Sequence, residues 1–252
     1  MTAAAHLASS DKMTWHRYID FYEPHLKRLT GAQRVLEFGV FHGASLRYLA
    51  ERYPAAIIVG CDILPTQDDW PRSERIDYVR VDQGDSSQLH RLFEQRPGPY
   101  DLVIDDGSHL PQHQRNCLVA ALPFVRDGGV YILEDLHTSH PAHPSMSRQD
   151  RRSTNSYQLL LAFEHIQSTG GSLSDGLVDA LSRRSLFTPS DVRTLFDQID
   201  SIELYRRATL PLSCYRCGST TFDYPQLVCS CGVRLADEAD SISAVISVRH
   251  TD

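Results

Sequence analysis

The stretch that decides the fold joins an apolar run to a cluster of polar side chains, and it reads Tyr100-Asp101-Leu102-Val103-Ile104-Asp105-Asp106-Gly107-Ser108-His109. The apolar run stops abruptly at two carboxylates, as a buried parallel strand does where it leaves its sheet. In open α/β sheets, ligands bind beyond the carboxyl ends of the strands. Two acids and a histidine at such an end can hold a divalent metal ion or accept a proton, although aspartate and serine also serve as ordinary helix caps.

Apolar runs that alternate with helical patterns surround this stretch and predict an α/β fold with a mostly parallel sheet. We expect further strands at 34–38, 55–63, 78–81 and 130–133, and an antiparallel terminal pair at 201–205 and 244–248. Helices are expected at 15–29, 44–52, 86–95, 113–124, 155–168, 173–184 and 189–196.

A glycine loop follows the first strand, which carries Glu37 near its end. Gly39 and Gly43 allow the backbone to approach a ligand closely, and the helix that follows offers free amide groups. The spacing differs from the Gly-x-Gly-x-x-Gly of dinucleotide-binding loops, which weakens the case for a pyrophosphate site. A glutamate at this strand end suits a cationic group, such as the amino group of a bound amino acid.

Two other strand ends carry groups that suit a nucleoside. Asp62 ends the second strand, where an acid hydrogen-bonds ribose hydroxyls in nucleotide-binding folds, although an ordinary loop aspartate is the alternative. Asp82 and Gln83 follow the third strand and either meet an adenine or form a polar turn.

A second acidic pair, Glu134-Asp135, follows the fifth strand. Because the fourth and fifth strands are neighbours in the usual order of such sheets, we expect Asp106 and Asp135 to converge. The polar stretch 137–153 contains two prolines, and we interpret it as a mobile lid over the site. Its histidines fit a solvated loop better than a set of ligands.

Composition restricts the class of protein. The chain has 252 residues, enough for one domain with a small appendage, and its formal charge of −7 argues against a large nucleic-acid surface. No run approaches the roughly 18 apolar residues of a membrane helix. The first ten residues lack the basic start and apolar core of a signal peptide, so we expect a cytoplasmic protein.

Four of the six cysteines crowd together near the C-terminus, as Cys214-Tyr215-Arg216-Cys217 and Cys229-Ser230-Cys231. Four thiolates satisfy tetrahedral zinc, and a reducing compartment favours metal over disulfides. The Cys-x-Cys pair is tighter than the usual spacing, so disulfides and free thiols stay open. Such a zinc ion would fold an insert at 211–235 and would not catalyse. Cys61 and Cys117 are expected to be reduced core residues.

Several of these motifs together resemble the class I S-adenosylmethionine-dependent methyltransferases, and more narrowly the metal-dependent sugar O-methyltransferases. These include macrolide-tailoring enzymes and the mycobacterial enzyme of methylmannose polysaccharide synthesis. The cephalosporin hydroxylase group carries the same Asp-Asp-Gly-Ser-His run, so this motif alone does not settle the reaction. The residues that carry the resemblance are Asp11-Lys12 with His16 and Tyr18, Glu37-x-Gly39-x-x-x-Gly43-x-Ser45, Val103 to His109, and Glu134-Asp135.

The resemblance implies a Rossmann-like sheet with an antiparallel last strand, carrying a small zinc-ribbon-like insert. The tail and first helix occupy 1–30 and the methyltransferase domain 31–252. The implied cofactor contacts are Glu37, Gly39, Gly43 and Ser45 for the methionine part, Asp62 for the ribose, Asp82 and Gln83 for the adenine, and Asp105 facing the cofactor. The implied magnesium ligands are Asp106, Asp135 and Glu134, with His109 as general base.

The leading hypothesis is therefore a homo-oligomeric, magnesium-dependent O-methyltransferase acting on a sugar or glycoside hydroxyl in polysaccharide or natural-product biosynthesis. One alternative is an RNA methyltransferase that uses the zinc insert as a guide. Another is a non-catalytic protein that binds the cofactor or serves assembly.

Overall fold

A seven-stranded sheet forms the centre of the protein in the computed structural model, which describes residues 6–7, 10–144, 146, 153–237 and 239–250. Each strand is rich in β-branched and aromatic residues, which suit a pleated, buried surface. The strands are β1 (Arg34–Phe38), β2 (Ile57–Asp62), β3 (Ile76–Arg80), β4 (Tyr100–Asp105), β5 (Val125–Leu133), β6 (Ile199–Arg206) and β9 (Ile242–Val248).

The strand order is β3-β2-β1-β4-β5-β9-β6. Strand β9 runs antiparallel to both of its neighbours, whereas β1 to β5 pair in parallel. The predicted α/β class, with a mostly parallel sheet and an antiparallel last strand, is confirmed. The order reverses direction between β1 and β4, where Phe38 lies beside Asp105. This is the switch point at which open α/β sheets bind their ligands.

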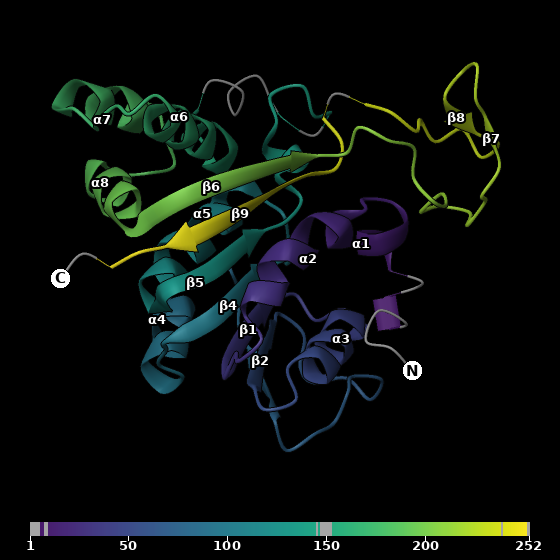
Figure 1. Cartoon of the computed structure of the whole chain (residues 1–252), viewed down its shortest axis with the longest axis horizontal. Helices are drawn as coiled ribbons and strands as arrows, with labels where there is room; N and C mark the ends of the chain where they lie inside the picture. Colours follow the sequence, from purple (N-terminus) through teal and green to yellow (C-terminus); the bar gives the residue numbers. More distant parts are fainter. Residues whose placement is uncertain (1–5, 8–9, 145, 147–152, 238, 251–252) are drawn as a thin grey trace.

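Helices cover both faces of the sheet (Figure 1). One face packs on α2 and α3 through residues such as Tyr22 and Leu49. The other packs on α4 to α8 through residues such as Leu92, Leu118 and Phe163. The helices are α1 (Asp11–Thr14), α2 (Tyr18–Arg28), α3 (Ala44–Arg52), α4 (Ser86–Gln95), α5 (Pro111–Ala121), α6 (Ser156–Ser168), α7 (Asp175–Ser182) and α8 (Pro189–Gln198), with short 3₁₀ helices η2 (Leu122–Phe124) and η3 (Leu136–Ser139).

Several boundaries differ from the sequence predictions. The helix expected at 15–29 is the shorter α2, at 18–28, and the separate short helix α1 precedes it at 11–14, because Arg17 takes a left-handed conformation with φ of 60° between them. Pro24 remains inside α2 without splitting it. Strand β5 begins at Val125, five residues before the predicted start, and its pairing with β4 is irregular between Tyr100 and Leu102. The predicted lid begins as η3, while residues 145 and 147–152 lie outside the described residues.

The cysteine-rich insert leaves the body between β6 and β9 and extends away from the sheet (Figure 1). Its regular structure is one short antiparallel pair, β7 (Phe222–Asp223) with β8 (Val228–Cys229). Among the described residues, no helix has the length and apolar character that crossing a membrane requires.

Candidate active site

A cavity of about 520 Å³ opens at the carboxyl ends of the parallel strands and is closed on one side by the N-terminal segment. Its volume falls in the usual range for small-molecule sites. The cavity wall includes eight of the predicted site residues: Gly39, Asp62, Asp82, Gln83, Asp106, His109, Glu134 and Asp135. The others, Glu37, Gly43, Ser45 and Asp105, are not among its lining residues.

The Lys12 ammonium group lies at the centre of a buried acidic cluster. Its Nζ is 3.1 Å from Glu37 Oε1, 2.8 Å from Asp106 Oδ2 and 2.9 Å from Glu134 Oε1. These acids come from the ends of β1, β4 and β5, so one side chain of α1 links three strands. Buried carboxylates need such a partner because removal from water penalises their charge.

Burial and pairing act in opposite directions on the pKa values of this cluster. Burial lowers the pKa of Lys12, but the charges of Asp106, Glu134 and Glu37 outweigh it and raise the pKa well above its usual value. Burial also raises the pKa of Glu37 and that of Glu134, and Lys12 only partly offsets this. The lysine therefore stays charged while the surrounding carboxyls hold protons more readily than exposed ones.

Glu37 is fixed by its immediate neighbours. The Ser45 hydroxyl donates to both of its carboxylate oxygens, at 2.7 and 2.6 Å, and Lys12 donates to one of them. The side chain is fully buried. These contacts orient Lys12, whose ammonium group is the cation beside Glu37 in this structure, and a contact between Glu37 and a ligand's amino group stays a prediction.

Asp106, His109 and Asp135 form a group whose candidate ligand atoms all lie within 4.8 Å of one another. His109 Nε2 is 3.9 Å from Asp106 Oδ1 and 3.5 Å from Asp135 Oδ2. The expected convergence of Asp106 and Asp135 is therefore present. Each carboxylate uses its other oxygen elsewhere, Asp106 on Lys12 and Asp135 on the Tyr18 hydroxyl at 2.9 Å.

Asp135 also faces two histidines. His16 Nε2 lies 3.9 Å and His137 Nδ1 3.6 Å from Asp135 Oδ1. Burial raises the pKa of Asp135, but His16, His109, His137 and the Tyr18 hydrogen bond outweigh it and lower the pKa to about 2. Burial lowers the pKa of His137 to about 4, so this imidazole is neutral at physiological pH.

Asp105 is not among the lining residues of the cavity, and its assignment as a residue facing the cofactor stays a prediction. Its side chain accepts hydrogen bonds from Gln83 Nε2 at 2.9 Å and the Tyr131 hydroxyl at 3.1 Å. Burial raises its pKa to about 7. Adjacent residues of a strand face opposite sides, so Asp106 reaches the cavity while Asp105 enters the core.

The residues assigned to the nucleoside are engaged with nearby backbone. Asp62 accepts from the amides of Val40 at 2.8 Å and Leu64 at 2.9 Å, which ties the glycine loop to the end of β2. Asp82 Oδ1 accepts from the Gly84 amide. Gln83 Oε1 accepts from the Ser108 amide at 2.8 Å. All the same, Asp62, Asp82 and Gln83 line the cavity.

Gly39 allows the loops after β1 and β4 to meet. Its φ of 90° lies in the region that favours glycine, and a Cβ atom there would lie 2.0 Å from the Asp106 carbonyl oxygen. Gly43 also has a positive φ, of 70°, and a Cβ atom would lie 2.3 Å from Pro71 Cδ. The two loop glycines therefore act by permitting backbone contacts.

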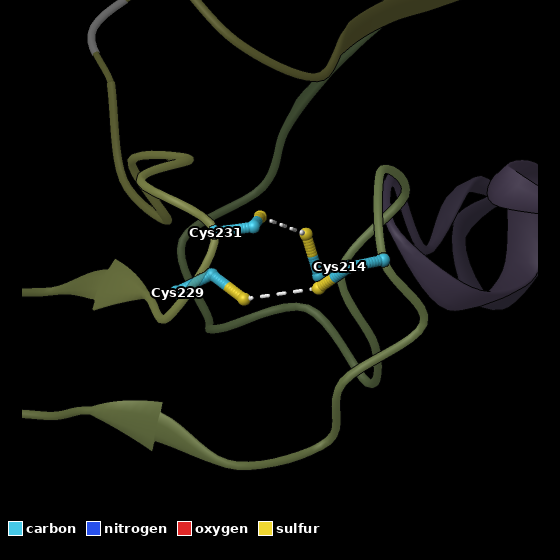
Figure 2. Close-up of side chains that lie close together, drawn as sticks. Cys214, Cys229 and Cys231 are labelled. Atoms are coloured by element: carbon cyan, nitrogen blue, oxygen red, sulfur yellow. Dashed lines mark hydrogen bonds between the residues drawn. The ribbon is translucent and has the colours of Figure 1, made fainter.

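The four C-terminal cysteines converge on one point of the insert (Figure 2). Cys214 and Cys231 Sγ atoms are 3.6 Å apart and those of Cys217 and Cys229 are 3.4 Å apart. These separations exceed the S–S bond of about 2.05 Å in a disulfide. They approach the edge of a tetrahedron built with Zn–S bonds of about 2.3 Å, roughly 3.8 Å.

Sequence reasoning assigned no role to four residues that complete the acidic site: Lys12, His16, Tyr18 and His137. Lys12, His16 and Tyr18 belong to the motif that resembles the sugar O-methyltransferases, and this motif was the indication in the sequence that they lie at the site. His137 was read as part of a solvated loop, but its side chain is only 13% exposed.

The pKa of Asp105 gives a testable pH dependence. The native carboxyl, with a pKa of about 7, keeps its proton at higher pH than the unfolded one, near 3.9. Stability from this group is therefore greatest at low pH and falls as pH rises toward 7, by up to about 1.4 kcal/mol per pH unit. Asp105→Asn should flatten the profile of unfolding free energy between about pH 5 and pH 7, measured by urea denaturation.

Asp179→Asn, on the exposed side of α7, is the matched control and should keep the wild-type slope. Equal slopes for Asp105→Asn and wild type would show that Asp105 titrates normally.

Comparison with known proteins agrees with this geometry. Residues 36–136 match the family model of a methyltransferase domain. Over 145 residues, or 54% of the chain, it is 37% identical to the 8-demethyl-8-(2-methoxy-alpha-L-rhamnosyl)-tetracenomycin-C 3'-O-methyltransferase of Streptomyces olivaceus. Over 133 residues, or 50% of the chain, it is 37% identical to the mycinamicin VI 2''-O-methyltransferase of Micromonospora griseorubida. These matches cover 36% and 33% of the relatives, so the chain spans about a third of their length.

Among solved structures, the chain resembles the MycE methyltransferase of the mycinamycin biosynthetic pathway, solved with Mg, SAH and mycinamycin VI. The TM-score is 0.64 at 23% identity, over 99% of this chain and 55% of that one, and this likeness concerns the fold. The fold and the family match agree. Residues 36–136 therefore match a methyltransferase domain, the chain shares its fold with the MycE methyltransferase, and the matched region resembles the O-methyltransferases named above.

Proposed function

We propose that this protein is an S-adenosylmethionine-dependent O-methyltransferase that methylates a hydroxyl group of a sugar or glycoside. The observation that carries the proposal is the convergence of Asp106, His109 and Asp135 at the switch point of a methyltransferase domain. One relative is named as a 3'-O-methyltransferase of a rhamnosyl-tetracenomycin and another as a 2''-O-methyltransferase of mycinamicin VI, which favours a glycoside over RNA as acceptor.

The cavity wall supports cofactor binding at the ends of β1 to β4. S-adenosylmethionine would supply an activated methyl group on sulfur, so the protein need only align the acceptor oxygen with it. Asp62 and the Gly39 loop offer polar groups for a nucleoside, and Ile63, Leu64 and Val81 offer apolar surface. Glu37 contacts Lys12 and Ser45, so we propose that it supports the methionine end through Lys12.

The donor set also fits a hard divalent cation. Two carboxylate oxygens, Asp106 Oδ1 and Asp135 Oδ2, face the same His109 nitrogen, and oxygen ligands are those that Mg²⁺ prefers. When bound, Mg²⁺ would polarise a sugar hydroxyl and make it easier to deprotonate. Glu134 is buried and paired with Lys12, so we assign it to the support of this site, with direct binding of the metal left as a prediction.

His109 is the proposed general base. Its ring lies between Asp106 and Asp135, and its Nδ1 is buried without a hydrogen-bond partner among the described residues. The backbone holds this position, since the Thr138 hydroxyl donates to the His109 carbonyl at 2.6 Å. Nε2 would accept the proton of the acceptor hydroxyl, and the two carboxylates would stabilise the imidazolium that forms.

We further propose that the cysteine insert binds structural zinc. Four sulfur atoms within 4.8 Å provide a complete tetrahedral set with no position for a substrate. The Cys231 amide donates to Cys229 and lowers the pKa of that thiol to about 6, which favours the thiolate that zinc requires. The other predictions, a homo-oligomer in the cytoplasm with the domain boundaries given above, remain untested.

Methyl transfer from labelled S-adenosylmethionine to a glycoside such as mycinamicin VI tests the proposed function. We expect turnover that requires added Mg²⁺ and falls about 10²- to 10⁴-fold in His109→Gln, with the affinity for S-adenosylhomocysteine nearly unchanged. His90→Gln, on the exposed side of α4, is the matched control. Full turnover after chelation of the metal, or in His109→Gln, would contradict the mechanism.

Metal analysis of the purified protein tests the zinc proposal. We expect about one zinc ion per chain, lost in Cys217→Ser and retained in Cys61→Ser, because Cys61 lies in the core away from the cluster. A zinc content near zero in wild type purified under reducing conditions would refute it.

A further inference from the structure

The cysteine-rich insert is joined to the active-site segment by a third apolar cluster, separate from the two that cover the sheet. Its buried members are Trp15, Cys214, Cys229, Val233 and Leu235. Trp15 follows α1 directly, and the other four belong to the insert. Cys214 and Cys229 therefore pack in the same cluster as Trp15, which is three residues beyond Lys12 in the chain.

Trp15 is held on its other sides by polar and aromatic groups. The Tyr215 ring meets it edge-on with centroids 4.8 Å apart, and the Arg207 guanidinium lies 4.9 Å from its ring centre. Arg207 also bonds Asp240 at 2.9 Å, and Asp240 accepts a hydrogen bond from Trp15 Nε1 at 3.4 Å. Trp15 is 4% exposed, so the surrounding residues enclose its side chain almost completely.

Backbone contacts fix the same segment to the insert. The Thr14 carbonyl accepts from the amides of Leu212 at 2.7 Å and Ser213 at 3.3 Å. One residue beyond Trp15, His16 Nδ1 lies 2.9 Å from Ser241 Oγ, where the chain re-enters β9. The segment that carries Lys12 and His16 into the site is therefore held by groups at both ends of the insert.

The insert has little to stabilise it except this cluster and its cysteines. Its only strands among the described residues are the two-residue pair β7 and β8, and a short segment of this kind generally needs a metal or disulfides to fold. If the four cysteines separate, Cys214 and Cys229 no longer pack against the Trp15 side chain. The position of α1 then depends on the remaining contacts of the body.

We propose that Trp15 is a positioning residue through which the zinc-bound insert holds Lys12 and His16 at the active site. This inference rests on the proposed zinc site and the proposed cofactor site. It gives the insert a role in cofactor binding in place of contact with a nucleic acid or a partner.

The test compares three variants by calorimetric titration with S-adenosylhomocysteine in excess Mg²⁺. Trp15→Ala should weaken binding about tenfold or more while zinc is retained, because Lys12 loses its fixed position. Trp15→Phe keeps an aromatic ring at this position and should restore most of the affinity. Tyr224→Ala changes an exposed ring of the same insert, whose ring contact is with Phe222, and should match wild type.

A second readout does not depend on the cofactor. Fluorine NMR of protein labelled with 5-fluorotryptophan gives one signal for each of Trp15 and Trp70. The signal that disappears in Trp15→Phe is that of Trp15. Removing zinc should shift or broaden the Trp15 signal and leave that of Trp70, whose indole donates to Phe41 beside the glycine loop. Failure of wild type to bind S-adenosylhomocysteine would reject the proposed function, and the fluorine signals would then decide this inference.

Two results would overturn the inference. One is wild-type affinity in Trp15→Ala with zinc retained. The other is a Trp15 signal that zinc removal leaves unchanged. A purified chain that holds no zinc would also overturn it, because the inference requires the zinc-bound insert.

Discussion

The ion cluster around Lys12 is the interaction on which the rest of the site depends. Glu37, Asp106 and Glu134 end three neighbouring strands and are turned toward one another at a buried edge of the sheet. Without a cation among them, their mutual repulsion and the loss of hydration would oppose this arrangement. The ammonium group of Lys12, in the N-terminal segment, offsets this repulsion and so stabilises the three acids beside one another.

This arrangement also divides the acidic groups into two sets. Glu37 and Glu134 accept hydrogen bonds from Lys12 and support the site through it. Asp106 and Asp135 each direct one oxygen toward His109. Burial raises the pKa of Glu134 and that of Asp106, whereas the neighbouring histidines and Tyr18 lower the pKa of Asp135. The proposed metal binding and proton transfer would use Asp106, Asp135 and His109 while Glu37 and Glu134 stay paired with Lys12.

Much of this edge could be predicted because parallel strands place their carboxyl ends together. The positions of Asp106, His109 and Asp135 followed from the end of an apolar run, a glycine turn and a neighbouring strand. The adjacency of the fourth and fifth strands and the antiparallel pairing of the two terminal strands were also predicted, whereas the full strand order was not. The contacts of Asp105 with Gln83 and Tyr131 were not predicted, because they depend on how β5 and the residues after β3 are placed beside it.

The N-terminal segment could not be placed from the sequence in the same way. Nothing in the pattern of residues 10–18 specifies where a four-residue helix lies on the sheet edge, because its position depends on contacts with residues more than 200 positions away. Arg17, which separates α1 from α2, takes a left-handed conformation that helical periodicity does not reveal. Lys12, His16 and Tyr18 entered the site through this tertiary placement.

The unfolding free energy of Lys12→Met, compared with wild type at about pH 8 and pH 5, tests the central role of this lysine most directly. Our account predicts a loss of about 3–5 kcal/mol at the higher pH, because three carboxylates remain buried without their cation. Much of this loss should disappear at the lower pH, since the raised pKa values of Glu37 and Glu134 allow these groups to become neutral. A loss below about 1 kcal/mol at both pH values would contradict the account, because it would mean that the acidic edge does not depend on Lys12.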